Sequence, residues 1–312
     1  MSDTVSQFVH LKPIHKQHYV GFDMDDTLIY SSAKSYRAFP NGPESIRKLH
    51  SEGHNIVVFS NQKKPRQSDK IVQAKVDAVI NLYSSVGNPV PILFLCARAE
   101  DKYRKPGIGM IDLVPSSYGV LKFFVGDADG SEGSHSDCDA AFAQEAKVPF
   151  YTPEKCFNVF PVIGKSELPT NLINSKQNFL TMILLVGYPA SGKTTYAKQV
   201  LEPKGFHRIS RDDLGTMAKC LKQARQLLGS DKDVVIDNLN ASQSDRKQWM
   251  DLANETGAQT IVIYFSCPMS RAISQNENRE RKVPAVVFYT FRKRFELPSL
   301  EEKIDNIYSI LE

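Results

Sequence analysis

Three aspartates stand within four positions near the start of the chain, in the stretch GFDMDDTLI. Asp23 and Asp25 lie two residues apart, directly after a short apolar run typical of a β-strand. In an extended segment, residues two apart point the same way, so both carboxylates can reach one site. One could attack a phosphorus atom or hold a cation, and the other could donate a proton to the leaving oxygen. An acidic surface turn is the alternative reading of this motif taken alone.

Three further segments carry groups suited to phosphate chemistry. VVFSNQ ends in a hydroxyl at Ser60, and YRKPGIGM places Lys105 before a proline. FFVGDADG adds a second acidic pair, Asp127 and Asp129, at the end of another apolar run. A hydroxyl can bind a phosphate oxygen, a fixed lysine can neutralise one, and carboxylates suit Mg²⁺. Each group alone could be structural, but together they predict a phosphoryl-transfer site at the carboxyl ends of neighbouring strands.

The second half of the chain contains GYPASGKTT, which fits the phosphate-binding pattern G-x-x-x-x-G-K-[ST]. An apolar run precedes it and a helical pattern follows, which is the context that such a loop requires. Backbone N–H groups and the helix N-terminus would face the phosphates of a nucleotide, Lys193 would reach the β- and γ-phosphates, and Thr194 would help hold Mg²⁺. The predicted nucleotide-binding residues are Gly187, Tyr188, Pro189, Ala190, Ser191, Gly192, Lys193, Thr194 and Thr195.

Downstream segments supply candidates for the acceptor side of this second site. Asp212 in SRDDLG could take a proton from an attacking hydroxyl, although one of the two aspartates there could equally cap a helix. VVIDNLN places Asp237, Asn238 and Asn240 at another strand end. The basic run ENRERK could form a lid that supplies Arg279 to the transferred phosphoryl group. Charged helix surface is the plain alternative for that arginine.

These residues need two sets of alternating strands and helices to position them. The first set is predicted as strands 19–23, 55–60, 91–96 and 121–127 with helices 43–52, 68–85, 107–113 and 139–147. The second is predicted as strands 179–187, 206–210, 233–238 and 260–266 with helices 192–202, 213–229 and 243–256, then helical segments to the end. The expected fold class is α/β, with two domains that are each a mainly parallel sheet flanked by helices. We expect domain 1 at 1–165, a linker at 166–178 and domain 2 at 179–312.

Length and composition set further bounds. The 312 residues suit two domains, and 41% apolar with 24% charged residues is ordinary for a globular protein. The sequence has no long apolar run for a membrane span and no secretory layout at its start. The five scattered cysteines form no C-x-x-C pair, which argues against a zinc site or a disulfide framework. A net charge of +4 is compatible with an anionic partner.

The order of the motifs GFDMDDTLI, FSNQ, YRKPGIGM and FVGDADG resembles the haloacid dehalogenase phosphatase superfamily. The resemblance implies that Asp23 is a nucleophile that forms an aspartyl-phosphate, and that Asp25 is the general acid and then the base. It also implies that Ser60 and Lys105 bind the phosphoryl oxygens, and that Mg²⁺ sits between Asp23, the main-chain carbonyl of Asp25, and Asp127. Only 37 residues separate Asp23 from Ser60 and 45 separate Ser60 from Lys105, so we expect no large lid and a site open to a polymer end.

Together with MILLVGYPASGKTT, SRDDLG, VVIDNLN and the tail FRKRFELPSLEE, these motifs resemble the polynucleotide kinase/3′-phosphatase family over roughly the whole chain. The resemblance implies DNA end repair with Mg²⁺ and ATP: removal of 3′-phosphates and phosphorylation of 5′-hydroxyls before ligation. Asp212 would be the base of the kinase and Arg279 its lid arginine. The implied partners are DNA ends at single-strand breaks, nicks, gaps and double-strand ends, with no membrane. We expect a monomer in the nucleus.

The sequence departs from the family pattern at several points. Asp26 stands where the family prefers glycine, and SEGSHSDCDAAFA is a shortened segment in which Asp139 matches the last aspartate. Only 18 residues precede the first predicted strand, which we expect to be too few for the forkhead-associated module of animal members. Three alternatives stay open: an enzyme that heals RNA ends, an end-binding scaffold with a decayed phosphatase half, and a metabolite phosphatase fused to a nucleoside kinase.

Overall fold

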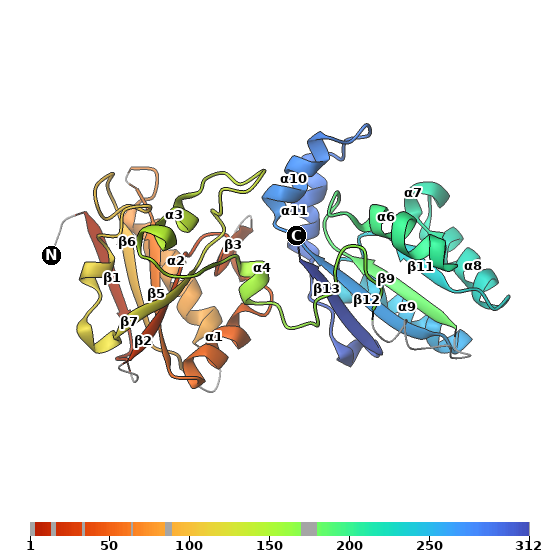
Figure 1. The fold of residues 1–312 in the computed structure, drawn as a ribbon, viewed down its shortest axis with the longest axis horizontal. Helices are drawn as coiled ribbons and strands as arrows, with labels where there is room; N and C mark the ends of the chain where they lie inside the picture. Colours follow the sequence, from red (N-terminus) through yellow and green to blue (C-terminus); the bar gives the residue numbers. More distant parts are fainter. Residues whose placement is uncertain are drawn as a thin grey trace. The chain divides into compact units, whose positions relative to one another are not determined.

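The computed structural model describes residues 4–13, 17–32, 35–63, 65–84, 89–169 and 180–311. Its contacts divide the chain into two compact units, Met1–Asn158 and Val159–Glu312. Each unit is built on its own β-sheet with helices packed against it, as Figure 1 shows for both halves. No helix among the described residues is long and apolar enough to cross a membrane.

The first unit contains a six-stranded sheet in the order β1-β6-β5-β2-β7-β8. Strand β1 pairs antiparallel with β6, and all the other neighbours are parallel. The strands are β1 (Val5–His10), β2 (His18–Phe22), β5 (His54–Asn61), β6 (Ile92–Ala97), β7 (Val120–Val125) and β8 (Phe150–Tyr151). A separate hairpin joins β3 (Ile29–Ser32) and β4 (Ser35–Ala38).

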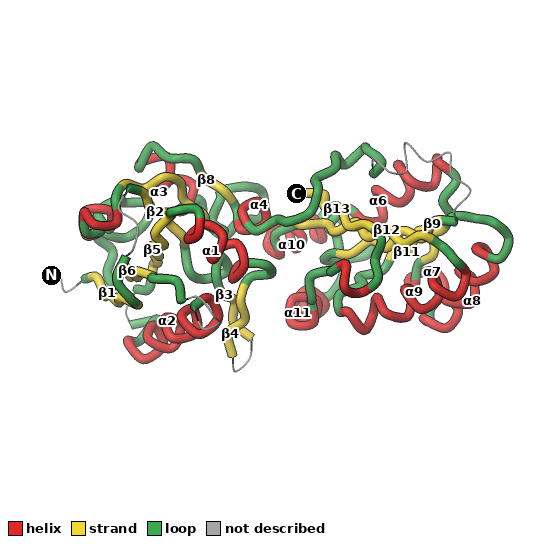
Figure 2. Tube along the Cα trace, turned by 90° about the horizontal axis from the view of Figure 1, so that it is seen from below, coloured by secondary structure: helices red, strands yellow, loops and turns green. Residues whose placement is uncertain are grey.

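Both faces of this sheet are buried, because its central strands are continuous apolar runs. Alternate residues of β5 enter different cores: Val58 lies with the apolar side chains of α1 and α2, whereas Phe59 packs with Phe142 of α3. Helices α1 and α2 therefore cover one face and α3 the other (Figure 2). The helices are α1 (Gly42–Ser51), α2 (Asp69–Tyr83), α3 (Cys138–Glu145) and the short α4 (Pro153–Cys156).

The second unit has an all-parallel five-stranded sheet in the order β10-β11-β9-β12-β13. Its strands are β9 (Thr181–Val186), β10 (His207–Ile209), β11 (Val234–Asp237), β12 (Gln259–Ser266) and β13 (Asn306–Leu311). Its helices are α6 (Lys193–Tyr196, continued by a π-type turn Ala197–Leu201), α7 (Arg211–Leu214), α8 (Met217–Leu228), α9 (Gln243–Thr256), α10 (Met269–Glu277) and α11 (Ala285–Arg294). Both sheets are thus mainly parallel and flanked by helices, as the sequence predicts.

Two predicted elements differ from the structure. The helix expected at 107–113 is only a 3₁₀ turn at Ile111–Leu113. The Gly107 N–H donates to the Arg104 carbonyl and the Gly109 N–H to the Lys102 carbonyl, at 2.8 and 3.1 Å, so the preceding backbone lacks the bonds between residues four apart that build an α-helix. The end of the chain, expected to be helical, is strand β13, whose residues pair with β12 along its whole length.

The expected first-domain boundary at residue 165 lies inside the second unit. Val162 forms a bridge with Ser309, the Ile163 N–H donates to the Ser309 carbonyl at 2.9 Å, and Ile163 lies in a core of the second sheet. Strand β13, which the sequence did not predict, provides this edge. Most of the expected linker, from 170 to 178, falls outside the described residues.

Candidate active sites

Asp23 lies at the carboxyl end of β2, between the ends of β5 and β7. Its N–H donates to the Val125 carbonyl at 2.8 Å, so the neighbouring strand fixes its backbone. The side chain is buried, and one carboxylate oxygen accepts a hydrogen bond from Lys105 Nζ at 2.6 Å. Because Asp23, Ser60 and Asp127 all end or follow adjacent parallel strands, the topology brings them to one edge of the sheet.

Lys105 is the fixed cation of this edge. Its Nζ lies 2.6 Å from Asp23 Oδ1 and 2.6 Å from Asp139 Oδ1. Its backbone is tied to the end of β5, since Asn61 accepts from the Lys105 N–H at 2.9 Å and donates to the Lys105 carbonyl at 3.0 Å. Burial lowers the pKa of Lys105, but the Asp139 and Asp23 carboxylates outweigh burial and hold that pKa above its usual value. Lys105 is therefore a permanent positive charge at this site.

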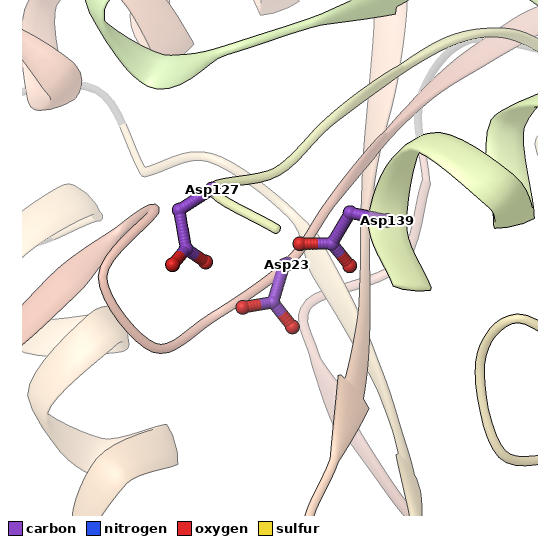
Figure 3. A group of neighbouring side chains, drawn as sticks. All are labelled: Asp23, Asp127 and Asp139. Atoms are coloured by element: carbon purple, nitrogen blue, oxygen red, sulfur yellow. The ribbon is translucent and has the colours of Figure 1, made fainter. Parts of the chain in front are cut away.

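Three carboxylates gather around this lysine, from Asp23, Asp127 and Asp139, with one oxygen of each within 4.8 Å of the others (Figure 3). Burial raises the pKa of Asp23 to about 7, although Lys105 opposes the rise. Burial also raises the pKa of Asp127 to about 9, and the charges of Asp23 and Asp139 add to it. One lysine thus leaves the cluster short of positive charge, and carboxylate oxygens are the ligands that Mg²⁺ prefers. The residues present fit a divalent cation.

Asp139 is the member of this cluster that the predicted site residues did not include. It stands in the first turn of α3, where its second oxygen accepts from the Ala128 N–H at 3.1 Å. Asp139 thus joins the loop after β7 to Lys105. The matching of Asp139 to the family segment was the one sequence signal that pointed to it.

Asp129, which the sequence places in a cation site beside Asp127, does not belong to this cluster. Its Oδ1 accepts from the N–H and the hydroxyl of Ser131 at 3.0 and 2.8 Å and so closes a turn. The chain has already left the extended conformation of β7 there, so residues two apart no longer share a direction.

Asp25 reaches a different set of partners from Asp23. Its Oδ2 accepts from Gln62 Nε2 at 2.6 Å and from Lys75 Nζ at 2.7 Å. Gln62 Nε2 also lies 2.8 Å from Ser60 Oγ, so the hydroxyl at the end of β5 belongs to the same network. Gln62 stands within the motif FSNQ, but no sequence signal pointed to Lys75, which reaches the site from α2.

Asp26 occupies a left-handed backbone position with φ of 57°. Its N–H donates to the Ile29 carbonyl at 2.7 Å and closes the turn that follows Asp25. Left-handed residues favour glycine, and aspartate is among the few others that adopt this conformation. This explains the preference for glycine at the position.

The loop from Gly187 to Gly192 links β9 to the helix that starts at Lys193. Gly187, Ala190 and Gly192 have φ values of 153°, 60° and 89°, so the loop turns through backbone conformations that glycine favours. Lys193 is buried and bends back over the loop, where its Nζ donates to the carbonyls of Gly187, at 2.8 Å, and Tyr188. Burial lowers the pKa of Lys193 to about 8. The loop has the shape of a phosphate cradle with its cation in place.

A pocket of about 520 Å³ opens beside this loop. Of the predicted nucleotide-binding residues, Pro189, Ala190, Lys193 and Thr194 line it, whereas Gly192 and Thr195 line a different pocket. The pocket beside the loop is also lined by Asp212 from α7, Asp237 from β11, and Arg279 from the segment between α10 and α11. Further lining residues that the sequence did not single out as catalytic include Arg211, Arg281 and Arg294. The pocket thus gathers acidic and basic side chains from separate elements, as phosphoryl transfer requires.

Neither aspartate of SRDDLG is the N-cap of the helix that follows, so the alternative reading of Asp212 or Asp213 as that cap is wrong. Ser210 caps α7 by accepting from the Asp212 N–H at 3.2 Å, and Asp213 pairs with Arg208 at 2.7 Å. Asp212 itself is exposed and lines the pocket. It is therefore the aspartate of the pair that remains available to an acceptor hydroxyl in this arrangement.

Comparison with known proteins matches one family model to each half of the chain. The family model described as polynucleotide kinase 3 phosphatase matches residues 18–157, and a model described as an AAA domain matches residues 182–220 and 215–298. A bifunctional polynucleotide phosphatase/kinase of Schizosaccharomyces pombe is 30% identical over 98% of this chain and 82% of its own length. A protein of Acanthamoeba polyphaga mimivirus, provisionally given the same description, is 29% identical over 93% of this chain and 83% of its own length.

Part of the chain also matches a plant enzyme. The polynucleotide 3′-phosphatase ZDP of Arabidopsis thaliana is 32% identical over 44% of this chain and 23% of its own length. A haloacid dehalogenase-like phosphatase fold is thus followed by a P-loop kinase fold. Because the match to the Schizosaccharomyces pombe protein runs through both units, the chain belongs to the bifunctional polynucleotide phosphatase/kinase family.

Proposed function

We propose that the chain is a DNA end-processing enzyme that removes 3′-phosphates and phosphorylates 5′-hydroxyls with ATP, so that strand breaks can be ligated. The observation that supports this proposal is that one chain carries two separate groups of side chains suited to phosphate chemistry. Lys105 lies between Asp23 and Asp139 in the first unit, and the cradle around Lys193 opens into a polar pocket in the second.

In the first site, an Asp23 oxygen would attack the phosphorus of the terminal 3′-phosphate while the bond to the 3′-oxygen breaks. Asp25 would give its proton to that oxygen, which leaves as a hydroxyl. Water would then attack the aspartyl-phosphate, with Asp25 taking the proton, and release inorganic phosphate. Lys105 holds positive charge beside the nucleophile throughout, and the Ser60 hydroxyl would bind a phosphoryl oxygen. Mg²⁺, held by Asp23, Asp127 and the main-chain carbonyl of Asp25, would offset negative charge on the phosphoryl group when bound.

In the second site, ATP would place its β- and γ-phosphates in the loop that ends at Lys193. The 5′-hydroxyl of the polynucleotide would attack the γ-phosphorus, with Asp212 accepting its proton and ADP leaving. Lys193 and Arg279 would balance the charge on the transferred group. Thr194 would help hold the Mg²⁺ that accompanies the nucleotide.

The test uses the purified chain and a duplex with a single nick that bears a 3′-phosphate and a 5′-hydroxyl. With Mg²⁺ and ATP we expect both ends to be converted, so that a ligase can then seal the nick. If no phosphate is released, the first unit is an end-binding scaffold. A matched RNA substrate that is converted clearly faster would assign the chain to RNA healing, and mononucleotides converted faster than oligomers would indicate a metabolite enzyme.

A further inference from the structure

Lys75 is a buried lysine on α2 that makes its contacts at the first active site. Its Nζ donates to Asp25 Oδ2 at 2.7 Å and to Gln62 Oε1 at 3.0 Å. Only 7% of its side chain is exposed. A buried cation is costly unless it is paired and hydrogen-bonded, and these two contacts provide that pairing.

An apolar residue would suit the position of Lys75 better if packing were its only role. Val72, Val76 and Val79 on the same helix are buried in the core of the sheet face that α2 covers. A lysine in this row places its charge at the edge where Asp25 lies. The contact with the Asp25 carboxylate, and not packing in the core, therefore accounts for a lysine at position 75.

Gln62 has a fixed position from which its side chain acts as a second hydrogen-bond donor to Asp25. It is fully buried, and its N–H donates to the Ala97 carbonyl at 2.8 Å. The Arg98 guanidinium donates to the Gln62 carbonyl, so the backbone is fixed from both sides. The side-chain amide then bridges Asp25 Oδ2 and Ser60 Oγ, at 2.6 and 2.8 Å.

Both donors converge on the same oxygen of Asp25. The carboxylate is otherwise half-exposed, with 42% of the side chain accessible, and would be free to rotate without them. With Oδ2 held by Gln62 and Lys75, Oδ1 is the oxygen left for proton exchange. The same amide ties this orientation to the phosphate-binding hydroxyl of Ser60.

We propose that Lys75, acting with Gln62, is a positioning residue that fixes which oxygen of Asp25 delivers the proton to the leaving group. The proposal rests on the function proposed for the first site. It predicts that Lys75 matters when the leaving oxygen needs a proton and matters little when it does not.

The test compares two substrates that differ in their leaving group. In a 3′-phosphorylated oligonucleotide the leaving group is the 3′-oxygen, a poor leaving group that needs a proton as the bond breaks. In p-nitrophenyl phosphate the leaving group is a stable phenolate that needs no proton. Single-turnover rates with Mg²⁺ report only the first chemical step. For Lys75→Met we expect the oligonucleotide rate to fall about 100-fold, in the range typical of lost general acid catalysis, and the p-nitrophenyl phosphate rate to fall less than about threefold.

The controls separate positioning from folding. Lys70→Met changes an exposed lysine of the same helix and should leave both rates unchanged. Asp25→Asn should show the same selective loss, and Lys75→Arg should recover part of the oligonucleotide rate because it keeps a donor at the end of the side chain. ATP-dependent phosphorylation of 5′-hydroxyls by the same preparations should not change.

Equal losses on the two substrates, or no loss on the oligonucleotide, would overturn the proposal. If Lys75→Met lowers the melting temperature too far for rates to be compared, Gln62→Met breaks the network from its other side and must show the same selectivity. A wild-type protein that releases no phosphate from either substrate would instead overturn the proposed function of the first site.

Discussion

Replacing Asp26 by glycine and by alanine gives two variants that differ only in the backbone preference of one position. Both lose the carboxylate, so every contact of that side chain is removed equally. At φ of 57° a β-carbon costs about 1–2 kcal/mol. The greater conformational freedom of glycine in the unfolded chain lowers the free energy of unfolding of Asp26→Gly by about 0.4–1 kcal/mol and so offsets part of this difference. We therefore expect Asp26→Gly to be more stable than Asp26→Ala by about 0.5–1 kcal/mol.

The assay is thermal unfolding of the full chain in metal-free buffer, following the transition of the first unit. A difference of this size corresponds to a melting temperature about 1–4 °C higher for Asp26→Gly in a domain of this length. The transition of the second unit serves as an internal standard and should not move. Equal melting temperatures, or a higher one for Asp26→Ala, would refute the claim that the left-handed turn explains the family preference for glycine.

Two further predictions concern protons at the two sites. In metal-free protein, burial and the neighbouring carboxylates raise the pKa of Asp127 from the ordinary 3.8 to about 9, so the folded chain holds a proton that the unfolded chain has released. The stability of the first unit should therefore fall as the pH rises from about 4 to 9. Mg²⁺ should raise the melting temperature of this unit more at pH 8 than at pH 5.5. Asp127→Asn should make the metal-free stability less dependent on pH. Because burial lowers the pKa of Lys193 to about 8, binding of ATP phosphates should take up protons near pH 8.5 and few near pH 6.5. Calorimetry in buffers of different ionisation enthalpy measures this uptake, and a value that is the same at both pH values would contradict the assignment.

Sequence reasoning identified the residues that end or follow strands. Asp23, Ser60 and Asp127 were predictable because the carboxyl ends of neighbouring parallel strands share one edge, whatever the details of packing. The loop around Lys193 was predictable because its glycines and lysine act through a local conformation. In the pocket beside it, Asp212 and Asp237 end or closely follow strands, whereas Arg279 lies between α10 and α11 and Arg294 comes from α11.

Residues that reach the first site from helices were beyond such reasoning. Asp139 acts from the first turn of α3 and Lys75 from the middle of α2, and only the packing of those helices on the sheet shows where their side chains end. The same holds for strand β13, since its residues acquire their extended conformation by pairing with β12. Asp129 was wrongly predicted to share a cation site with Asp127. Residues two apart point the same way only while the chain stays extended, and the chain is no longer extended after β7.

The central claim is that the chain carries two independent phosphate chemistries. The most direct measurement follows both ends of one nicked duplex, with a 3′-phosphate and a 5′-hydroxyl, in the presence of Mg²⁺ and ATP. Asp23→Ala should abolish release of the 3′-phosphate and leave 5′-phosphorylation intact, and Lys193→Ala should do the reverse. Loss of both activities from either single change in a folded protein would contradict the account.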